Sequence, residues 1–197
     1  MTAQVSDLFM FQGRSFDLPG ISEGDIFSPE LLGIHPAGVS TACYRGYQAV
    51  FAVRGFRLVL KTLYASLYAE GPERYTPLIG PPINGVIPVS GEEHDQFNNI
   101  YRNIRYPLPY SGGVLIAATF INELCEHMGF HPPWKYRDVW ELVFEDGRLT
   151  KAIDCSKRMA EARERMLRMR QDDSAAEDQT NALYAWIEKS FDRSYYQ

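Results

Sequence analysis

The sequence lacks the features that mark disulfide-rich secreted proteins, membrane-spanning proteins and cysteine-rich metal sites. It has 3 cysteines, Cys43, Cys125 and Cys155, and no two of them have the CxxC spacing of redox or zinc motifs. No run of about 18 apolar residues is present to cross a bilayer, and residues 1–7 lack the basic and apolar regions of a signal peptide. We therefore expect a soluble protein of the cytoplasm, where thiols stay reduced, with no membrane association.

Glycine-rich phosphate loops are also missing. Neither GxGxxG nor GxxxxGK[ST] occurs, so nucleotide binding by these motifs has no support. The net charge is −5, which argues against a surface built as a whole for nucleic acid. We predict no cofactor, and nucleic acid is a disfavoured partner.

Aromatic residues are the main excess in the composition. The chain of 197 residues contains 12 Tyr and 11 Phe and is 45% hydrophobic. This composition is typical of a globular domain with a β-rich core, because aromatic side chains fit the half-buried surface of a sheet. The length fits one domain with an appendage. We predict the α+β class: an antiparallel sheet built from hairpins, with one packed helix and a C-terminal helical tail.

Turn residues and apolar runs place the predicted strands. In three segments a glycine-containing turn divides two apolar and aromatic runs, which is the pattern of a β-hairpin. These segments are residues 8–18, 47–62 and 138–153. A buried strand at about 112–118 leads into the predicted packed helix, which spans about 119–128 and ends at a glycine.

Residues 70–109 are rich in glycine and proline and are expected to hold little regular structure. A connection of this length without its own elements is usually functional or mobile. Within it, Glu92-Glu93-His94-Asp95 groups three carboxylates with an imidazole. Such a cluster binds a cation or transfers protons in some proteins, but a charged run in a loop is far more often only solvated.

The chain divides into two predicted parts. Residues 1–153 form the mixed α+β globular domain, and residues 154–197 form the helical tail. In the tail, predicted helices at about 156–170 and 180–191 are joined by an acidic break at 171–179.

The first tail helix combines a methionine seam with many arginines, a pattern that suits an adaptable protein interface. The predicted partner-binding residues are Met159, Arg163, Met166, Met169 and Arg170. A protein partner or a second copy of the chain would bind through the C-terminal helices. The alternative is that the methionine face packs on the chain's own domain.

Two groups of residues are candidates for chemistry. His127 and His131 are four apart and, with Glu123, are weak candidates for a metal site. A glycine and two prolines interrupt the helix around these histidines, so a structural helix end is the competing interpretation. Cys43 with a histidine base is a second candidate, for nucleophilic catalysis, although a free cysteine is more often a small buried hydrophobe.

Four blocks of residues carry a resemblance to other proteins. They are Thr41–Tyr47, Tyr110–Ala117, His127–Tyr136 and Glu141–Gly147. In these blocks the chain is similar to a set of uncharacterised bacterial proteins of about this size. The resemblance implies a bacterial cytoplasmic origin, and it implies no activity, cofactor or catalytic residue.

We therefore expect a non-catalytic cytoplasmic protein-binding module. An immunity- or antitoxin-like protein, or an accessory subunit of a bacterial defence or toxin system, fits the small size, the acidic balance and the aromatic content. The alternative is a metal-dependent or Cys/His hydrolase of unknown substrate. A third hypothesis, a nucleic-acid accessory protein acting through the basic tail helix, is the least favoured.

Overall fold

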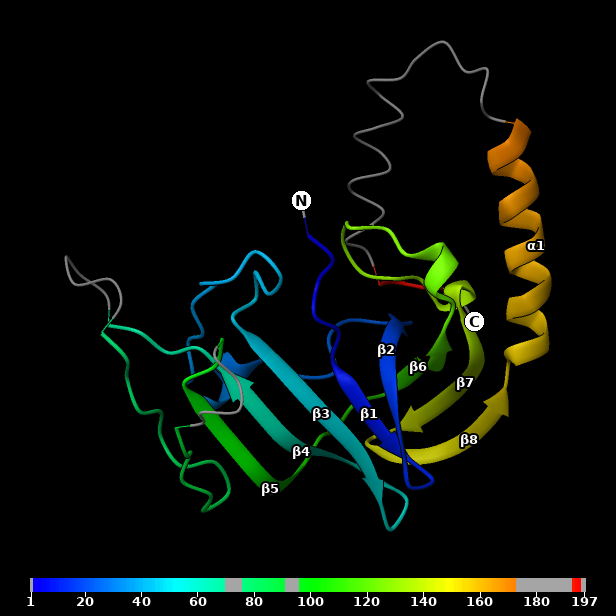
Figure 1. Cartoon of the computed structure of the whole chain (residues 1–197). Coiled ribbons are helices and arrows are strands. Elements are labelled where there is room, and N and C mark those ends of the chain that lie inside the picture. Colours follow the sequence, from blue (N-terminus) through cyan, green and yellow to red (C-terminus); the bar gives the residue numbers. More distant parts are fainter. Residues whose placement is uncertain (1, 70–75, 91–95, 173–192, 196–197) are drawn as a thin grey trace.

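The computed structural model describes residues 2–69, 76–90, 96–172 and 193–195 (Figure 1). Within them lie eight strands and one α-helix. The strands are β1 (Leu8–Phe11), β2 (Arg14–Ile21), β3 (Tyr47–Arg54), β4 (Arg57–Ala65), β5 (Asn99–Pro107), β6 (Gly112–Phe120), β7 (Tyr136–Glu145) and β8 (Arg148–Asp154). The helices are α1 (Ser156–Asp172) and the short 3-10 turns η1 (Pro29–Leu32), η2 (Asn122–Leu124) and η3 (Pro133–Lys135).

All eight strands belong to one sheet, in the order β3-β1-β2-β6-β7-β8-β4-β5. An additional pairing between β3 and β4 closes the sheet on itself, and β5 adds to β4. In Figure 1, β6, β7 and β8 curve round on the right and α1 stands beyond them. The sheet is mixed and not antiparallel throughout, because β1 pairs parallel with β3. The prediction of a purely antiparallel sheet missed this non-local pairing.

Three pairs of consecutive strands are antiparallel neighbours: β1 with β2, β3 with β4, and β7 with β8. Each pair is joined by two residues with positive φ, as the favoured two-residue turns require. The turns are Gln12-Gly13, Gly55-Phe56 and Asp146-Gly147. At Gly147 a Cβ atom would also overlap the carbonyl oxygen of Leu108, so this turn accepts only glycine.

Apolar side chains form two clusters on opposite faces of β6. Ile116 belongs to a large cluster that includes Phe9 and Phe144. Its neighbours Leu115 and Ala117 belong to a smaller cluster. Successive side chains of a strand point to opposite faces, and Met159 and Tyr195 from the C-terminal part of the chain pack on the smaller cluster.

The helix predicted at 119–128 does not form. Strand β6 continues to Phe120, which pairs with Tyr136 of β7, and only the single turn η2 follows. Phe120 also packs edge-on against Tyr136, with ring centroids 5.1 Å apart. Pairing with β7 therefore overrides the local helical pattern.

The C-terminal part of the chain returns to its own sheet. Helix α1 packs on β7 and η3. Residues 193–195 bind the end of β2. The Ile21 N–H donates to Arg193 O (2.8 Å), and the Tyr195 N–H donates to Ile21 O (3.2 Å). The predicted second tail helix at 180–191 lies outside the described residues.

No helix among the described residues is both long enough and apolar enough to cross a membrane.

Candidate functional site

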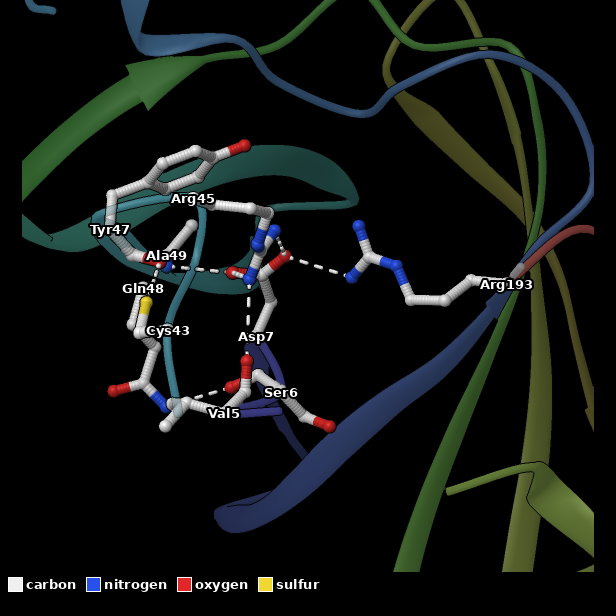
Figure 2. A network of polar contacts seen from close by, with 9 residues as sticks. All are labelled: Val5, Ser6, Asp7, Cys43, Arg45, Tyr47, Gln48, Ala49 and Arg193. Atoms are coloured by element: carbon white, nitrogen blue, oxygen red, sulfur yellow. Dashed lines mark hydrogen bonds and ion pairs between the residues drawn. The ribbon is translucent and has the colours of Figure 1, made fainter. Parts of the chain in front are cut away.

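A buried ionic network joins three distant parts of the chain (Figure 2). Asp7, which directly precedes β1, is only 3% exposed. Arg45 donates to both of its carboxylate oxygens, at 2.8 and 3.0 Å, and Arg193 donates to Oδ2 at 3.1 Å. The backbone N–H of Ala49 donates to Oδ1 at 2.8 Å. We call Asp7, Arg45 and Arg193 the ionic clamp.

Aromatic rings and one glycine place the two arginines. Gly46 has φ 68°, and this conformation lets the chain turn from Arg45 into β3. A Cβ atom at this position would overlap the carbonyl of Ala37, so glycine is needed here. The Arg45 guanidinium lies 4.6 Å from the centre of the Tyr47 ring. The guanidinium of Arg193 lies 4.9 Å from the centre of the Phe130 ring. Figure 2 shows Arg45 and Arg193 approaching the Asp7 carboxylate from different sides.

The electrostatics fix the clamp in its charged form. Burial opposes ionisation of Asp7, but the charges of Arg45 and Arg193 and the Ala49 N–H together hold the pKa of the carboxyl below its usual range. Burial also acts to lower the pKa of Arg45, and the Asp7 charge overcomes it and raises that pKa. Neither group exchanges protons near neutral pH. The clamp therefore fastens chain segments together and is unsuited to acid–base catalysis.

Cys43 lies beside the clamp as a protonated thiol. It is buried, and its Sγ donates to the carbonyl of Tyr47 at 3.2 Å. Burial raises the pKa of the thiol above its ordinary value. A nucleophilic cysteine needs the opposite shift, so this geometry does not favour the Cys/His hydrolase.

The three weak metal candidates do not form a site. Glu123 and His127 are exposed, whereas His131 stacks on Phe120 with ring centroids 4.6 Å apart. Burial and then the charge of Lys135 lower the pKa of His131. In the part of the chain that the structure describes, no group of three or more His, Cys, Asp or Glu side chains is arranged to hold a metal ion. The Glu92–Asp95 cluster lies outside that part.

A buried lysine that the sequence analysis overlooked lies nearby. Lys135 is 1% exposed, and its Nζ is 3.0 Å from Glu126 Oε2. The ammonium also lies 5.4 Å from the centre of the Trp134 ring. Lysine is almost never this deeply buried unless it is paired, so the ion pair fixes the connection between β6 and β7.

Two of the predicted partner-binding residues make intramolecular contacts. Met159 packs against the smaller apolar cluster. Arg163 donates to the backbone carbonyls of Trp134 (2.8 Å) and Tyr136 (2.6 Å). Met166 is half-buried on α1. Met169 and Arg170 belong to α1, but their side chains lie outside the described part.

Exposed apolar side chains gather in residues 77–89, a segment that lies on the opposite side of the molecule from α1 in Figure 1. We call residues 77–89 the aliphatic arm. Its exposed side chains are Leu78 (46%), Ile79 (83%), Ile87 (68%) and Val89 (55%). Scattered exposed aliphatic residues are normal, but four of them within one short segment make the arm a candidate interaction surface.

The backbone of the arm is held firmly against β5. The buried Asn99 side chain accepts from Gly80 N (2.8 Å) and donates to Leu78 O (2.7 Å). Tyr101 donates to Pro81 O at 2.9 Å. A Cβ atom at Gly80 would overlap the Tyr101 hydroxyl, so glycine is needed for the arm to pass this close to β5.

Further along, the arm turns back on itself. Ile83 and Val86 exchange backbone hydrogen bonds of 3.0 and 2.8 Å around Asn84-Gly85. The Asn84 side chain donates to Ile104 O of β5 at 2.8 Å. Asn-Gly is a turn signal in the sequence, but the anchorage of this turn on β5 has no local sequence signal.

None of the family models, curated proteins or solved structures compared with the chain matches it.

Proposed function

We propose that this protein is a non-catalytic protein-binding module and that the aliphatic arm is its contact surface. The single observation that carries the proposal is the exposure of Ile79 and Ile87 on a backbone held against β5. The Asn99 side chain holds the backbone beside Ile79, and backbone hydrogen bonds between Val89 and Ile100 hold it near Ile87. Isoleucine side chains are normally buried in the interior of a protein. A partner that covers them removes the same apolar surface from water.

The arm is suited to binding because its shape is set in advance. Burial of each large aliphatic side chain contributes about 1.5–3 kcal/mol. Association costs less when the binding segment is already ordered. Prolines at four positions of the arm fix φ, and the polar side chains of β5 hold the backbone. These contacts leave little conformational freedom to lose on binding.

The proposed setting is the bacterial cytoplasm, with an immunity- or antitoxin-like role or a role as accessory subunit of a defence or toxin system. All three cysteines are free thiols, including the exposed Cys125, which supports a reducing compartment. A net charge of −5 supports a partner of basic surface.

The test compares tagged wild type with the variant I79D/I87D in pull-downs from bacterial lysate at mild salt. A partner identified by mass spectrometry is then purified and its Kd measured directly. We expect I79D/I87D to weaken binding about tenfold or more, because central apolar anchors each contribute more than about 1 kcal/mol.

The matched control is Phe56→Asp, which adds a charge at another exposed apolar residue, in the turn between β3 and β4. Asp tolerates the positive φ of 63° at this position. We expect the control to bind normally. A partner that binds I79D/I87D normally but is lost on Met166→Asp would contradict the arm and move the contact surface to the tail helix.

A further inference from the structure

A cavity of about 510 Å³ lies between the loop after β2 and the connection from β5 to β6. Its volume falls in the range of small-molecule sites, roughly 300–1,000 Å³. The lining residues that matter are Glu23, Asp25, Phe27, Leu31, Tyr106 and Tyr110. None of them belongs to the aliphatic arm or to the ionic clamp, so the cavity is a separate feature of the fold.

The floor of the cavity is apolar and already formed. Phe27 is buried and meets the Tyr47 ring edge-on, with centroids 6.4 Å apart. Tyr110 is buried and its hydroxyl donates to Gly113 O at 3.2 Å, which holds the ring in place. At the rim, Leu31 is 82% exposed. A large aliphatic side chain kept in water beside an apolar cavity is the arrangement that an apolar ligand would cover.

The charge around the cavity has one sign. Glu23 and Asp25 are exposed lining residues, and the lining contains no lysine, arginine or histidine. Among the described residues, neither carboxylate has an ion-pair partner. Tyr106 and Tyr110 line the same space, and a tyrosine ring attracts a cation that lies over its face.

We propose that this cavity binds a small organic cation with an apolar body, meaning an ammonium group carried by an aromatic or alkyl skeleton. The body lies against Phe27, Leu31 and the tyrosine rings, and the ammonium group lies beside Glu23 and Asp25. This binding function goes beyond the protein-binding role of the arm and does not depend on it.

The test uses benzyltrimethylammonium as the probe and the full-length protein. Methyl NMR spectra are recorded while the probe is titrated, with phenylmethanesulfonate and benzyl alcohol as anionic and neutral comparison probes. We expect saturable shifts of the Ile26, Leu31 and Leu108 methyl groups, which line the cavity, with the cation. The anion is expected to cause none, and the neutral alcohol to bind more weakly.

Variants then test the charges. E23Q/D25N removes both carboxylate charges from exposed positions and is expected to weaken cation binding about fivefold to tenfold, the amount expected for two solvent-exposed charge contacts. Leu31→Ala is expected to weaken it as well. The matched control is Glu30→Gln, an exposed residue of the same loop that does not line the cavity, and it should leave the Kd unchanged.

Three results would overturn the proposal. One is equal binding of the anion and the cation, or shifts that never saturate. Another is an unchanged Kd in E23Q/D25N. The third is a peptide bearing lysine or arginine that shifts these methyl groups when the small cation does not, which would assign the cavity to a polypeptide. The variant I79D/I87D should bind the cation normally, so failure of the arm proposal is distinguishable from failure of this one.

Discussion

The ionic clamp and the aliphatic arm both depart from the rule that charged side chains are exposed and aliphatic side chains are buried, and they depart from it in opposite ways. The clamp places a carboxylate and two guanidinium groups inside the protein. The arm places four large aliphatic side chains in water. In the clamp, the chain itself compensates for the burial of charge, because each carboxylate oxygen of Asp7 accepts hydrogen bonds.

The arm shows no such compensation among the described residues. Its polar backbone atoms are the part that the chain satisfies, through Asn99, Tyr101 and Asn84. Ile83 packs in the core, whereas Leu78, Ile79, Ile87 and Val89 face outward. The difference teaches that unusual burial of charge serves the fold in this protein. For the unusual exposure of apolar surface we propose a partner outside the chain.

Loss of the central carboxylate should have the largest effect. Asp7→Asn leaves the guanidinium groups of Arg45 and Arg193, which are 23% and 13% exposed, without a counter-charge. Loss of one partner of a buried ion pair costs about 3–5 kcal/mol, and we expect the lower end of that range. Urea denaturation followed by circular dichroism measures this change in the free energy of unfolding. The control Glu30→Gln removes an exposed carboxylate and should stay within about 0.5 kcal/mol of wild type. A similarly small change in Asp7→Asn would show that the clamp is not structural.

Loss of the arm's main anchor should come next. Asn99→Ala leaves the Gly80 N–H and the Leu78 carbonyl without their partner, and we expect a loss of about 2–3 kcal/mol. Hydrogen exchange at residues 77–89 should also become faster. The control is Asn122→Ala, at an exposed position in η2. Unchanged exchange in Asn99→Ala would mean that other contacts hold the arm.

Removal of the second guanidinium should have a smaller effect. Arg193 makes one hydrogen bond to Asp7 where Arg45 makes two. We therefore expect Arg193→Met to lower the free energy of unfolding by about 2 kcal/mol, and Arg45→Met to lower it more. The amide of Tyr195, which bonds to Ile21, should exchange faster in Arg193→Met. The reverse order of the two arginines would refute this division of roles.

Acid should weaken the clamp gradually. The folded state lowers the pKa of Asp7 below its ordinary value of 3.8. The stabilisation is therefore complete above that value and is lost as pH falls through the folded pKa. Between about pH 5 and pH 2, the free energy of unfolding should fall more steeply in wild type than in Asp7→Asn. Parallel curves would show that Asp7 titrates alike in both states.

Local turn chemistry made part of the fold predictable from the sequence. The strand pairs around Gln12-Gly13, Gly55-Phe56 and Asp146-Gly147 lie where the turn residues place them. The helix at 119–128 was wrong because Phe120 pairs with a strand that begins sixteen residues later, at Tyr136. The local sequence pattern does not show which distant strand Phe120 pairs with.

The sites were harder to predict for the same reason. Asp7, Arg45 and Arg193 stand in three separate parts of the chain, and nothing in their spacing brings them together. Composition did mark residues 70–109 as irregular, and the arm lies within that range. The arm is held in place by the Asn99 and Tyr101 side chains. These side chains point toward the arm only once β5 has formed in the folded sheet.

The free energy of unfolding of I79D/I87D tests the central claim most directly. If the arm's aliphatic side chains are reserved for a partner, the free variant should unfold within about 0.5 kcal/mol of wild type, with the arm amides protected from exchange as before. A loss of about 2 kcal/mol or more, the scale of core substitutions, would show that these side chains hold the fold together and would contradict the account.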